Sequence, residues 1–500
     1  MKRGALFSFV LLGFLLLCAT ADVYATHNRA GELTYVFIAP NTIQVTIATW
    51  TKQSSVAADR DSLYIHWGDG SPDEELARTN GSPGGCCGVP NGVPIGNDVK
   101  YNLYIGTHTY PGAPPPPNNF FVVSMTDPNR NSGILNIDNG VGSVNVQFYI
   151  EDTIFYPTNI QNIGYNRSPI CLNPPIDYAY VGDTFWHNPA AYDPDGDSIS
   201  FRMITPLKAQ GVVVPLYVDP TLIPPGPGAN DRETLNPYTG MYMWATPQLA
   251  GIYNVAFLIS EYRRGFLLGT IDRDMQIIVL DDTTTPPVVK IPQDTCIRAG
   301  DALRAVITGT DVNFRHTVTL TGYGGPLAGD PTIFPDSLSP AKFVNGGGAT
   351  PIQGNPAFGY FTWNTVCLDI RTQPYQITFK AENNNPNPKI DLKTWSVEVI
   401  PPPPLNLTTA IENRKIHLHW KNPYLCDSIH TFRGFSIWRR VNSNPFIPEY
   451  CETGLAGRGY TMIANQVFDT SYTDLTAVHG QDMCYRILAH FSQKSPNGLY

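Results

Sequence analysis

The feature that most constrains the fold of this 500-residue chain is an alternation of apolar and polar residues with a period of two. It recurs at residues 43–47, 63–67, 144–150 and 253–259, and no amphipathic helix of three turns can be traced. Because successive side chains of a strand point to opposite faces of a sheet, this alternation indicates half-buried strands. We therefore predict an all-β chain built from tandem β-sandwiches.

The composition fits strands and turns and excludes a nucleic-acid binder. The chain has 43 Gly, 45 Pro and 26 Tyr, and only 15% of its residues are charged. Gly and Pro favour turns, and aromatic residues favour strands. The formal net charge is −9, and basic residues gather only in pairs such as Arg439 with Arg440. Nucleic-acid recognition needs a basic face, so nucleic acid is not an expected partner.

The N-terminus has the pattern of a signal peptide. Lys2 and Arg3 precede an apolar run at residues 5–17, and small residues then form two cleavage sites that end at Ala21 and Ala25. We favour cleavage after Ala25, which assigns residues 1–25 to the signal peptide. The apolar run is too short to span a bilayer, and no later stretch predicts a transmembrane helix. The mature chain is expected outside the cell or on its surface.

Breaks in the sequence divide the mature chain into four modules. Residues 281–287 are polar and then Pro-rich, and residues 401–404 are four consecutive prolines, which form a semi-rigid spacer. A softer boundary lies near residues 156–169. The predicted modules are 26–160, 161–281, 282–400 and 405–500.

The two middle modules share an internal repeat. Residues 240–244 (GMYMW) are followed by an aromatic-rich strand at 253–257, and residues 359–363 (GYFTW) are followed by one at 375–379. Each copy reads as a turn glycine, a strand with an inward Trp, a loop and a strand that ends near a glutamate. The repeat predicts one sandwich type used twice, as in a tandem stalk. Module 161–281 resembles an Ig-like or cadherin-like sandwich, and module 282–400 resembles an Ig-like sandwich that repeats it.

Eight cysteines remain after the signal peptide, an even number that allows disulfides in an exported chain. Cys296 and Cys367 lie in one predicted module, so we predict a structural disulfide between them. No CxxC pair is present, which argues against a thiolate metal site. The pairing of the others stays open; they are Cys86, Cys87, Cys171, Cys426, Cys451 and Cys484.

An acidic turn in the second module is a candidate metal site. Residues 193–197 (DPDGD) lead into a predicted strand at 198–201. Clustered carboxylates suit calcium, a hard cation that takes several oxygen ligands. An EF-hand is excluded because the glycine is fourth and Ile204 is at the twelfth position. A solvated or self-capped turn is the alternative. The predicted calcium ligands are Asp193, Asp195, Asp197 and Glu261.

The first and last modules resemble known sandwich families. Residues 67–71 (WGDGS) and 107–112 (THTYPG) resemble the two marks of a polycystic-kidney-disease (PKD) type domain. Asp69 is expected to fix its turn through backbone bonds, and a catalytic Asp69–His108 pair lacks a nucleophile. Residues 415–420, 434–440 and 484–489 resemble three strands of a fibronectin type III domain. The sequence ends where a last strand is expected, which predicts a fragment of a longer protein.

The chain as a whole resembles a family of large Bacteroidetes surface proteins, the gliding-motility-associated C-terminal-domain proteins. The resemblance rests on residues 26–32 (THNRAGE), 58–63 (ADRDSL), 127–131 (DPNRN) and the DPDGD turn. It implies export by the signal peptide and then by the type IX machinery of the outer membrane. The family's C-terminal sorting module is absent from these 500 residues.

These features favour binding or a structural role over catalysis. Tandem sandwiches with stiff linkers hold a contact surface away from the cell, so the leading hypothesis is an adhesin or surface-structural stalk that contacts an extracellular protein or glycan. A carbohydrate-binding accessory protein of a polysaccharide-degrading system is the alternative, which exposed coplanar aromatics on one sheet would favour. The sequence has no HExxH, GxSxG or phosphate-loop motif, so no enzyme is predicted.

Overall fold

The computed structural model describes residues 28–56, 59–83, 88–114, 120–137, 142–156, 166–223, 231–263, 265–328, 340–421, 432–442 and 446–491. Regular structure in these ranges is β-strand, apart from short 3-10 turns such as η3 (Ser143–Asn145), η4 (Pro220–Leu222), η5 (Gly325–Leu327) and η6 (Cys367–Asp369). This confirms the all-β prediction. The predicted signal peptide, Cys86, Cys87 and Cys426 and the chain end after residue 491 lie outside the described residues.

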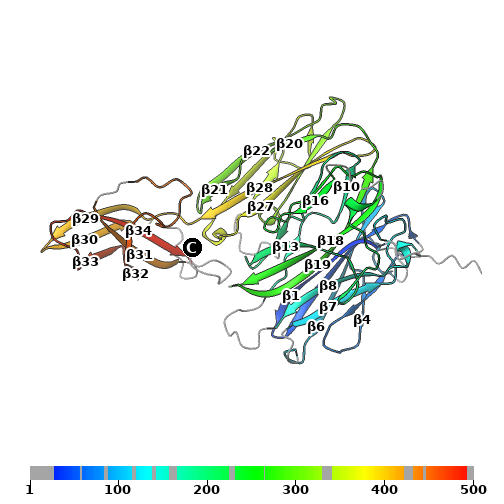
Figure 1. Ribbon diagram of the computed structural model, residues 1–500, viewed down its shortest axis with the longest axis horizontal. Helices are drawn as coiled ribbons and strands as arrows, with labels where there is room; N and C mark the ends of the chain where they lie inside the picture. The colour runs from blue at the N-terminus through cyan, green and yellow to red at the C-terminus, as the bar shows by residue number, and fades with distance from the viewer. Residues whose placement is uncertain are drawn as a thin grey trace, which may run out of the picture.

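A 12-stranded sheet runs through the first two predicted modules (Figure 1). Its strands are β1 (Asn28–Ala39), β2 (Thr42–Lys52), β3 (Ser62–His66), β4 (Glu74–Ala77), β5 (Val93–Gly96), β6 (Val99–Thr109), β7 (Phe120–Asp127), β8 (Phe148–Phe155), β10 (Ile176–Tyr180), β13 (Ser198–Ile204), β18 (Gly251–Arg263) and β19 (Phe266–Leu280). We call residues 28–155 the first unit and 166–280 the second unit.

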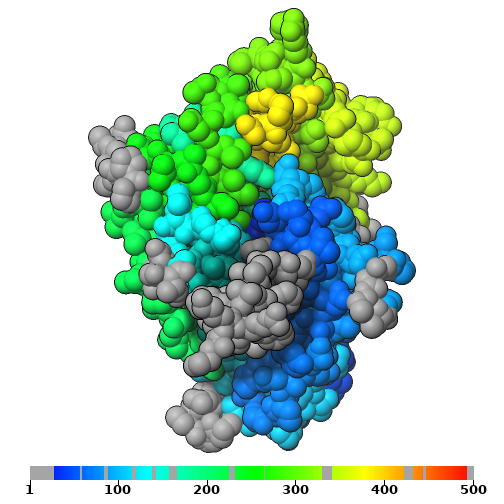
Figure 2. Space-filling view, turned by 90° about the vertical axis from the view of Figure 1, so that its right-hand side faces the viewer, coloured from blue at the N-terminus to red at the C-terminus, as the bar shows by residue number. Residues whose placement is uncertain are grey.

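Strand β19 of the second unit completes both layers of the first. In the strand order β4-β3-β7-β8-β19-β1-β2-β6-β5, both β8 and β1 pair with β19. They share one edge of β19, because β18 pairs along its other edge. Residues 269–271 of β19 pair with β8, and Asp274 pairs with Gly31 of β1. The two units also lie against each other in the space-filling view (Figure 2). The prediction of two separate sandwiches, 26–160 and 161–281, is wrong in this respect.

We call the line where β8 and β1 meet β19 the seam. Both faces of β19 are buried, and Ile277 and Val279 enter the apolar core of the second unit. Two of its charged residues reach partners in the first unit. Arg273 pairs with Glu32, and Asp274 pairs with Arg130 at 2.7 Å. A charged side chain that is fully buried needs a partner of opposite charge that is also buried. For Arg273 and Asp274 these partners, Glu32 and Arg130, belong to the first unit.

The second and third units share one plan, as the repeat predicts. The second strand of each runs parallel to its last, β10 along β19 and β21 along β28. In both, an inward Trp meets a Tyr edge to face, Trp244 on Tyr253 at 4.9 Å and Trp363 on Tyr375 at 5.0 Å between ring centroids. The repeated Trp and Tyr therefore make the same core contact in both units.

The remaining strands of the second unit are β9 (Ile170–Cys171), β11 (Phe185–His187), β12 (Ala191–Tyr192), β14 (Leu207–Ala209), β15 (Val212–Val213), β16 (Arg232–Leu235) and β17 (Tyr242–Ala245). The third unit has two sheets, β20-β22-β26-β24 and β21-β28-β27-β23-β25. Its strands are β20 (Val288–Lys290), β21 (Thr295–Arg298), β22 (Ala302–Thr310), β23 (Val318–Tyr323), β24 (Lys342–Val344), β25 (Ile352–Gly354), β26 (Ala357–Asn364), β27 (Tyr375–Asn383) and β28 (Ile390–Ile400).

The fourth unit, residues 405–491, extends to one side of the molecule (Figure 1). Its two sheets are β29-β30-β33 and β32-β31-β34 around a core that includes Trp420 and Phe435. The Trp of the predicted fibronectin-like motif is thus a core residue. The strands are β29 (Leu405–Glu412), β30 (Lys415–Lys421), β31 (Phe432–Val441), β32 (Thr461–Val467), β33 (Ser471–Asp474) and β34 (Met483–Phe491).

The disulfide of the third unit links it to the fourth. Cys296 on β21 bonds to Cys451, so the predicted Cys296–Cys367 pairing is wrong, although Cys367 is also disulfide-bonded. Beside this bond, the guanidinium of Arg298 lies 4.3 Å from the ring centre of Tyr450. The prediction paired two cysteines of the same module. It failed because Cys451 lies on a loop of the next unit that folds back onto β21.

The WGDGS turn is a structural element of the first unit. Asp69 Oδ1 accepts a hydrogen bond from the Ser71 amide at 3.0 Å, and Oδ2 lies 2.8 Å from His108 Nε2. The His108 ring stacks on buried Trp67, and the Tyr110 hydroxyl donates to the Trp67 carbonyl at 3.0 Å. Asp69 fixes its own turn as predicted, and His108 joins that turn to β6.

Removal of Arg130 tests the seam. Arg130 and Asp274 are both fully buried, so Arg130→Met leaves an uncompensated charge and should cost about 3–5 kcal/mol of unfolding free energy. Urea unfolding measures this loss. The double variant Arg130→Met with Asp274→Asn should recover a large part of it. A single-variant cost below about 1 kcal/mol would show that the ion pair does not hold the seam.

Candidate metal centre

The DPDGD turn joins β12 to β13 and is held by its own first residue. Asp193 Oδ1 accepts hydrogen bonds from the amides of Asp195 and Asp197, both at 2.8 Å. Gly196 has a φ of 81°, in the left-handed region that glycine adopts without strain. The self-capped turn proposed as an alternative therefore exists, but it uses only one oxygen of Asp193.

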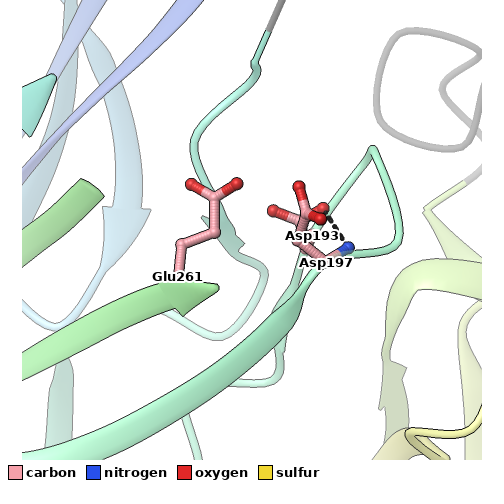
Figure 3. A group of neighbouring side chains, drawn as sticks. All are labelled: Asp193, Asp197 and Glu261. Atoms are coloured by element: carbon pink, nitrogen blue, oxygen red, sulfur yellow. Dashed lines mark hydrogen bonds between the residues drawn. The ribbon is translucent and has the colours of Figure 1, made fainter. Parts of the chain in front are cut away.

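Three carboxylates meet next to this turn. One oxygen each from Asp193, Asp197 and Glu261 lie within 4.8 Å of one another, and all three residues are buried. Glu261 stands near the end of β18 and points toward the two aspartates (Figure 3). The structure thus brings together three of the four predicted ligands, from two segments more than 60 residues apart.

Asp195, the fourth predicted ligand, is engaged elsewhere. Its Oδ1 accepts from Arg167 Nε at 2.9 Å and Nη2 at 2.7 Å, and its Oδ2 accepts from the Arg167 amide at 2.7 Å. Asp195 is also outside the group of three carboxylates that meet. Asp195 anchors the segment around Arg167, so the prediction of Asp195 as a metal ligand is corrected: the ligand group is Asp193, Asp197 and Glu261.

Arg263 neutralises only one of the three carboxylates. Its Nε lies 3.0 Å from both oxygens of Asp197. Its Nη2 also donates to the amide oxygen of Asn166 at 2.9 Å, and the Asn166 side-chain amide donates to Glu261 Oε2 at 2.8 Å. Asp193 Oδ2 and Glu261 Oε1 remain buried without a hydrogen-bond partner. Asp193 and Glu261 therefore each lack a basic side chain that would neutralise their charge.

The titration of the site reflects this imbalance. Burial, with Asp197 and Asp195 nearby, raises the pKa of Asp193 to about 8. Burial, with Asp193 and Asp197 nearby, also raises the pKa of Glu261 well above its usual range. A buried carboxylate must take up a proton or a cation, so the site has the charge and the unpaired oxygens that suit a hard divalent ion.

Asn166 and Arg167 are the site residues that the sequence did not indicate. They follow the soft boundary between the first two modules, where no strand pattern or motif marks them. Arg263 had a weak signal, since it directly follows the Glu261 strand end. A search for arginines beside clustered carboxylates would find Arg263, but only the fold shows Asn166.

The comparisons with known proteins give similarity in part of the chain and no family. No protein-family model and no curated protein matches. The tandem Ig repeats of Dlar are 14% identical, with 47% of this chain and 98% of that chain covered and a TM-score of 0.20. Human CDH23 EC21-23 is 14% identical, with 48% and 76% covered and a TM-score of 0.16.

A bacterial structure is similar to the same degree. The sialic acid binding region of the Streptococcus sanguinis SK1 adhesin is 11% identical, with 51% of this chain and 93% of that chain covered and a TM-score of 0.18. Scores at this level carry no argument about function. Among its described residues, no helix is both long and apolar enough to cross a membrane.

The pKa of Asp193 predicts how pH changes stability without metal. Between the ordinary aspartate value of 3.8 and the folded value of about 8, the native state holds the extra proton, so stability falls as pH rises through this window. In a chelator, the melting temperature of the wild type should fall more steeply from about pH 5 to pH 8 than that of Asp193→Asn. Parallel curves for the two proteins would contradict the raised pKa.

Proposed function

We propose that this chain is a modular extracellular protein, an adhesin or surface-structural stalk. The observation that carries the proposal is that its units are joined by direct contacts rather than by free linkers. β19 completes two units, Lys389 of the third unit lies 3.1 Å from Asp183 of the second, and Cys296–Cys451 ties the third to the fourth. A disulfide persists in oxidising compartments outside the cytoplasm.

Export and gliding belong to the same proposal. The resemblance to gliding-motility-associated surface proteins supports a signal-peptide route followed by the type IX outer-membrane machinery as a partner. We also propose that the chain acts by binding and not as an enzyme. In support, Asp69 and His108, the pair weighed for catalysis, are both used to hold the WGDGS turn.

We propose calcium as the ion of the acidic site, where it would stiffen the molecule. Calcium prefers carboxylate oxygens at flexible geometry, and Asp193 Oδ2 and Glu261 Oε1 are free to bind it. Neutralisation of buried acidic groups by the ion would favour the folded state, because the unfolded chain lacks the assembled site.

Calcium-dependent melting tests this proposal. At a calcium concentration about 100 times Kd, binding should add about 2.7 kcal/mol and raise Tm by about 5–10 °C relative to a chelator. Asp193→Asn should abolish the rise. Asp195→Asn is the matched control, because Asp195 pairs with Arg167, and it should keep the rise. No calcium response in the wild type would refute the site.

A glycan-binding role is the second candidate, and one sheet face favours it. Phe358 and Tyr360 are two residues apart on β26 and are exposed by 47% and 42%. They therefore point to the same outer face, about 7 Å apart, and Tyr360 pairs directly with exposed Val306 of β22. Aromatic rings side by side on a flat sheet can stack against sugar rings of a polysaccharide.

Binding to a polysaccharide array tests that role. Phe358→Ala and Tyr360→Ala should each weaken binding more than about tenfold if the rings are the contact residues. Phe314→Ala is the control and should leave binding intact, because Phe314 is an exposed aromatic residue (83%) on the loop between β22 and β23, away from the β26 face. Retained binding in all three variants, or none in the wild type, would remove the β26 face as a glycan site.

A further inference from the structure

Asp152 is a buried carboxylate of the first unit that lies close to the acidic site. It stands on β8 with an exposed fraction of 0%, and neither of its oxygens has a hydrogen-bond partner of ordinary length. Ile150 and Ile154, two positions away on either side, belong to the apolar core of the first unit. A buried carboxylate in such surroundings is costly unless a proton or a cation neutralises it.

Asp152 and Glu261 converge on one point of β19. Gly269 pairs with Glu261 of β18 on one side and with Ile154 of β8 on the other. A Cβ atom on Gly269 would lie 3.8 Å from Asp152 Oδ1, 3.8 Å from Glu261 Oε2 and 2.7 Å from the carbonyl oxygen of Thr153. A Cβ atom would be too close to the Thr153 carbonyl, so glycine at this position lets oxygen atoms of both units approach the strand.

The hydroxyl of Tyr35 adds another oxygen to this region. The Asn166 side-chain amide donates to Tyr35 Oη at 2.9 Å and to Glu261 Oε2 at 2.8 Å. Burial, with Glu261 and Asp152 nearby, raises the pKa of Tyr35 well above its usual range. The phenol oxygen therefore lies beside Glu261, and the Asn166 side-chain amide joins the two.

The carboxylates around the DPDGD turn do not by themselves offer enough free oxygen atoms to coordinate a calcium ion. Asp193 Oδ1 is used by two backbone amides, and both oxygens of Asp197 accept from Arg263. Glu261 Oε2 accepts from Asn166. Calcium takes six to eight oxygen ligands, so the turn group offers few oxygens that are free of other bonds. Asp152 offers two.

We propose that the cation binds across the seam, with Asp152 as a ligand from the first unit and Glu261 shared between Asp152 and the DPDGD turn. The inference rests on the proposed calcium site and extends it from one turn to the junction of two units. Strands β8, β18 and β19 and the turn before β13 all contribute, so the ion holds the first unit to the second. The site would bind a divalent cation that prefers oxygen ligands.

Asp152→Asn tests the inference in the full chain, with Asp272→Asn as its matched control. Asp272 is on β19, is also 0% exposed and also has two oxygens without a hydrogen-bond partner. Successive side chains of β19 point to opposite faces, so Asp272 faces away from Gly269 and neighbours Asp274 and Arg130. Both substitutions keep the side-chain shape and remove a buried charge, so both variants should fold.

Calcium affinity is measured by titration calorimetry, with Asp193→Asn in parallel and magnesium as a second ion. We expect Asp152→Asn to weaken calcium binding by about 10–100-fold, Asp193→Asn to weaken it at least as much, and Asp272→Asn to leave it unchanged. In a chelator, Asp152→Asn should melt no lower than the wild type, because it removes an uncompensated buried charge.

The outcomes separate this inference from the calcium site itself. If Asp193→Asn loses binding while Asp152→Asn binds as the wild type does, the ion sits on the turn alone and the cross-seam site is overturned. If Asp152→Asn and Asp272→Asn weaken binding equally, the effect is a general loss of buried charge and the inference also fails. If the wild type binds neither calcium nor magnesium, the proposed calcium site fails together with it.

Discussion

The pairing of β19 with the first unit is the interaction on which the rest of the molecule depends. β19 is the last strand of the second unit, and both layers of the first unit end on it, one at β8 and the other at β1. Arg273 with Glu32 and Asp274 with Arg130 place buried charges of opposite sign across this edge. Buried ion pairs contribute little net stability compared with apolar contacts, but a wrong register leaves bare charges and is strongly disfavoured. They therefore specify how the two units meet.

The same constraint explains where the acidic site lies. The shared strand β19 has β8 of one unit on one side and β18 of the other unit on the other side, and each carries an acidic residue near Gly269. Burial then makes every unpaired carboxylate expensive. Arg263 and Arg167 satisfy Asp197 and Asp195, which leaves Asp193, Glu261 and Asp152 as the carboxylates that the proposed ion would bind. A cation at this junction would hold the two units in a fixed arrangement.

Much of the fold could be predicted from sequence because local patterns encode it. Period-two alternation located strands such as β2, β3 and β18, and the repeated Trp and Tyr identified the common plan of the second and third units. The acidic turn and Glu261 were found for the same reason: the turn chemistry is local and the strand end is marked. The features that failed are set by contacts between units or between distant segments of one unit. Nothing in the sequence of β19 says that it pairs with β1, that Asp195 turns to Arg167, or that Cys296 meets Cys451.

Native-state hydrogen exchange of the full chain, followed at β2 of the first unit and β18 of the second, tests most directly whether β19 makes these units one cooperative structure. Because β1 and β8 end on β19, amides in β2 and β18 should open with the same free energy and respond together to added denaturant. If β2 exchanges with a clearly lower opening free energy while β18 and β19 stay protected, the first unit unfolds by itself, and the account of a shared strand that joins two units is contradicted.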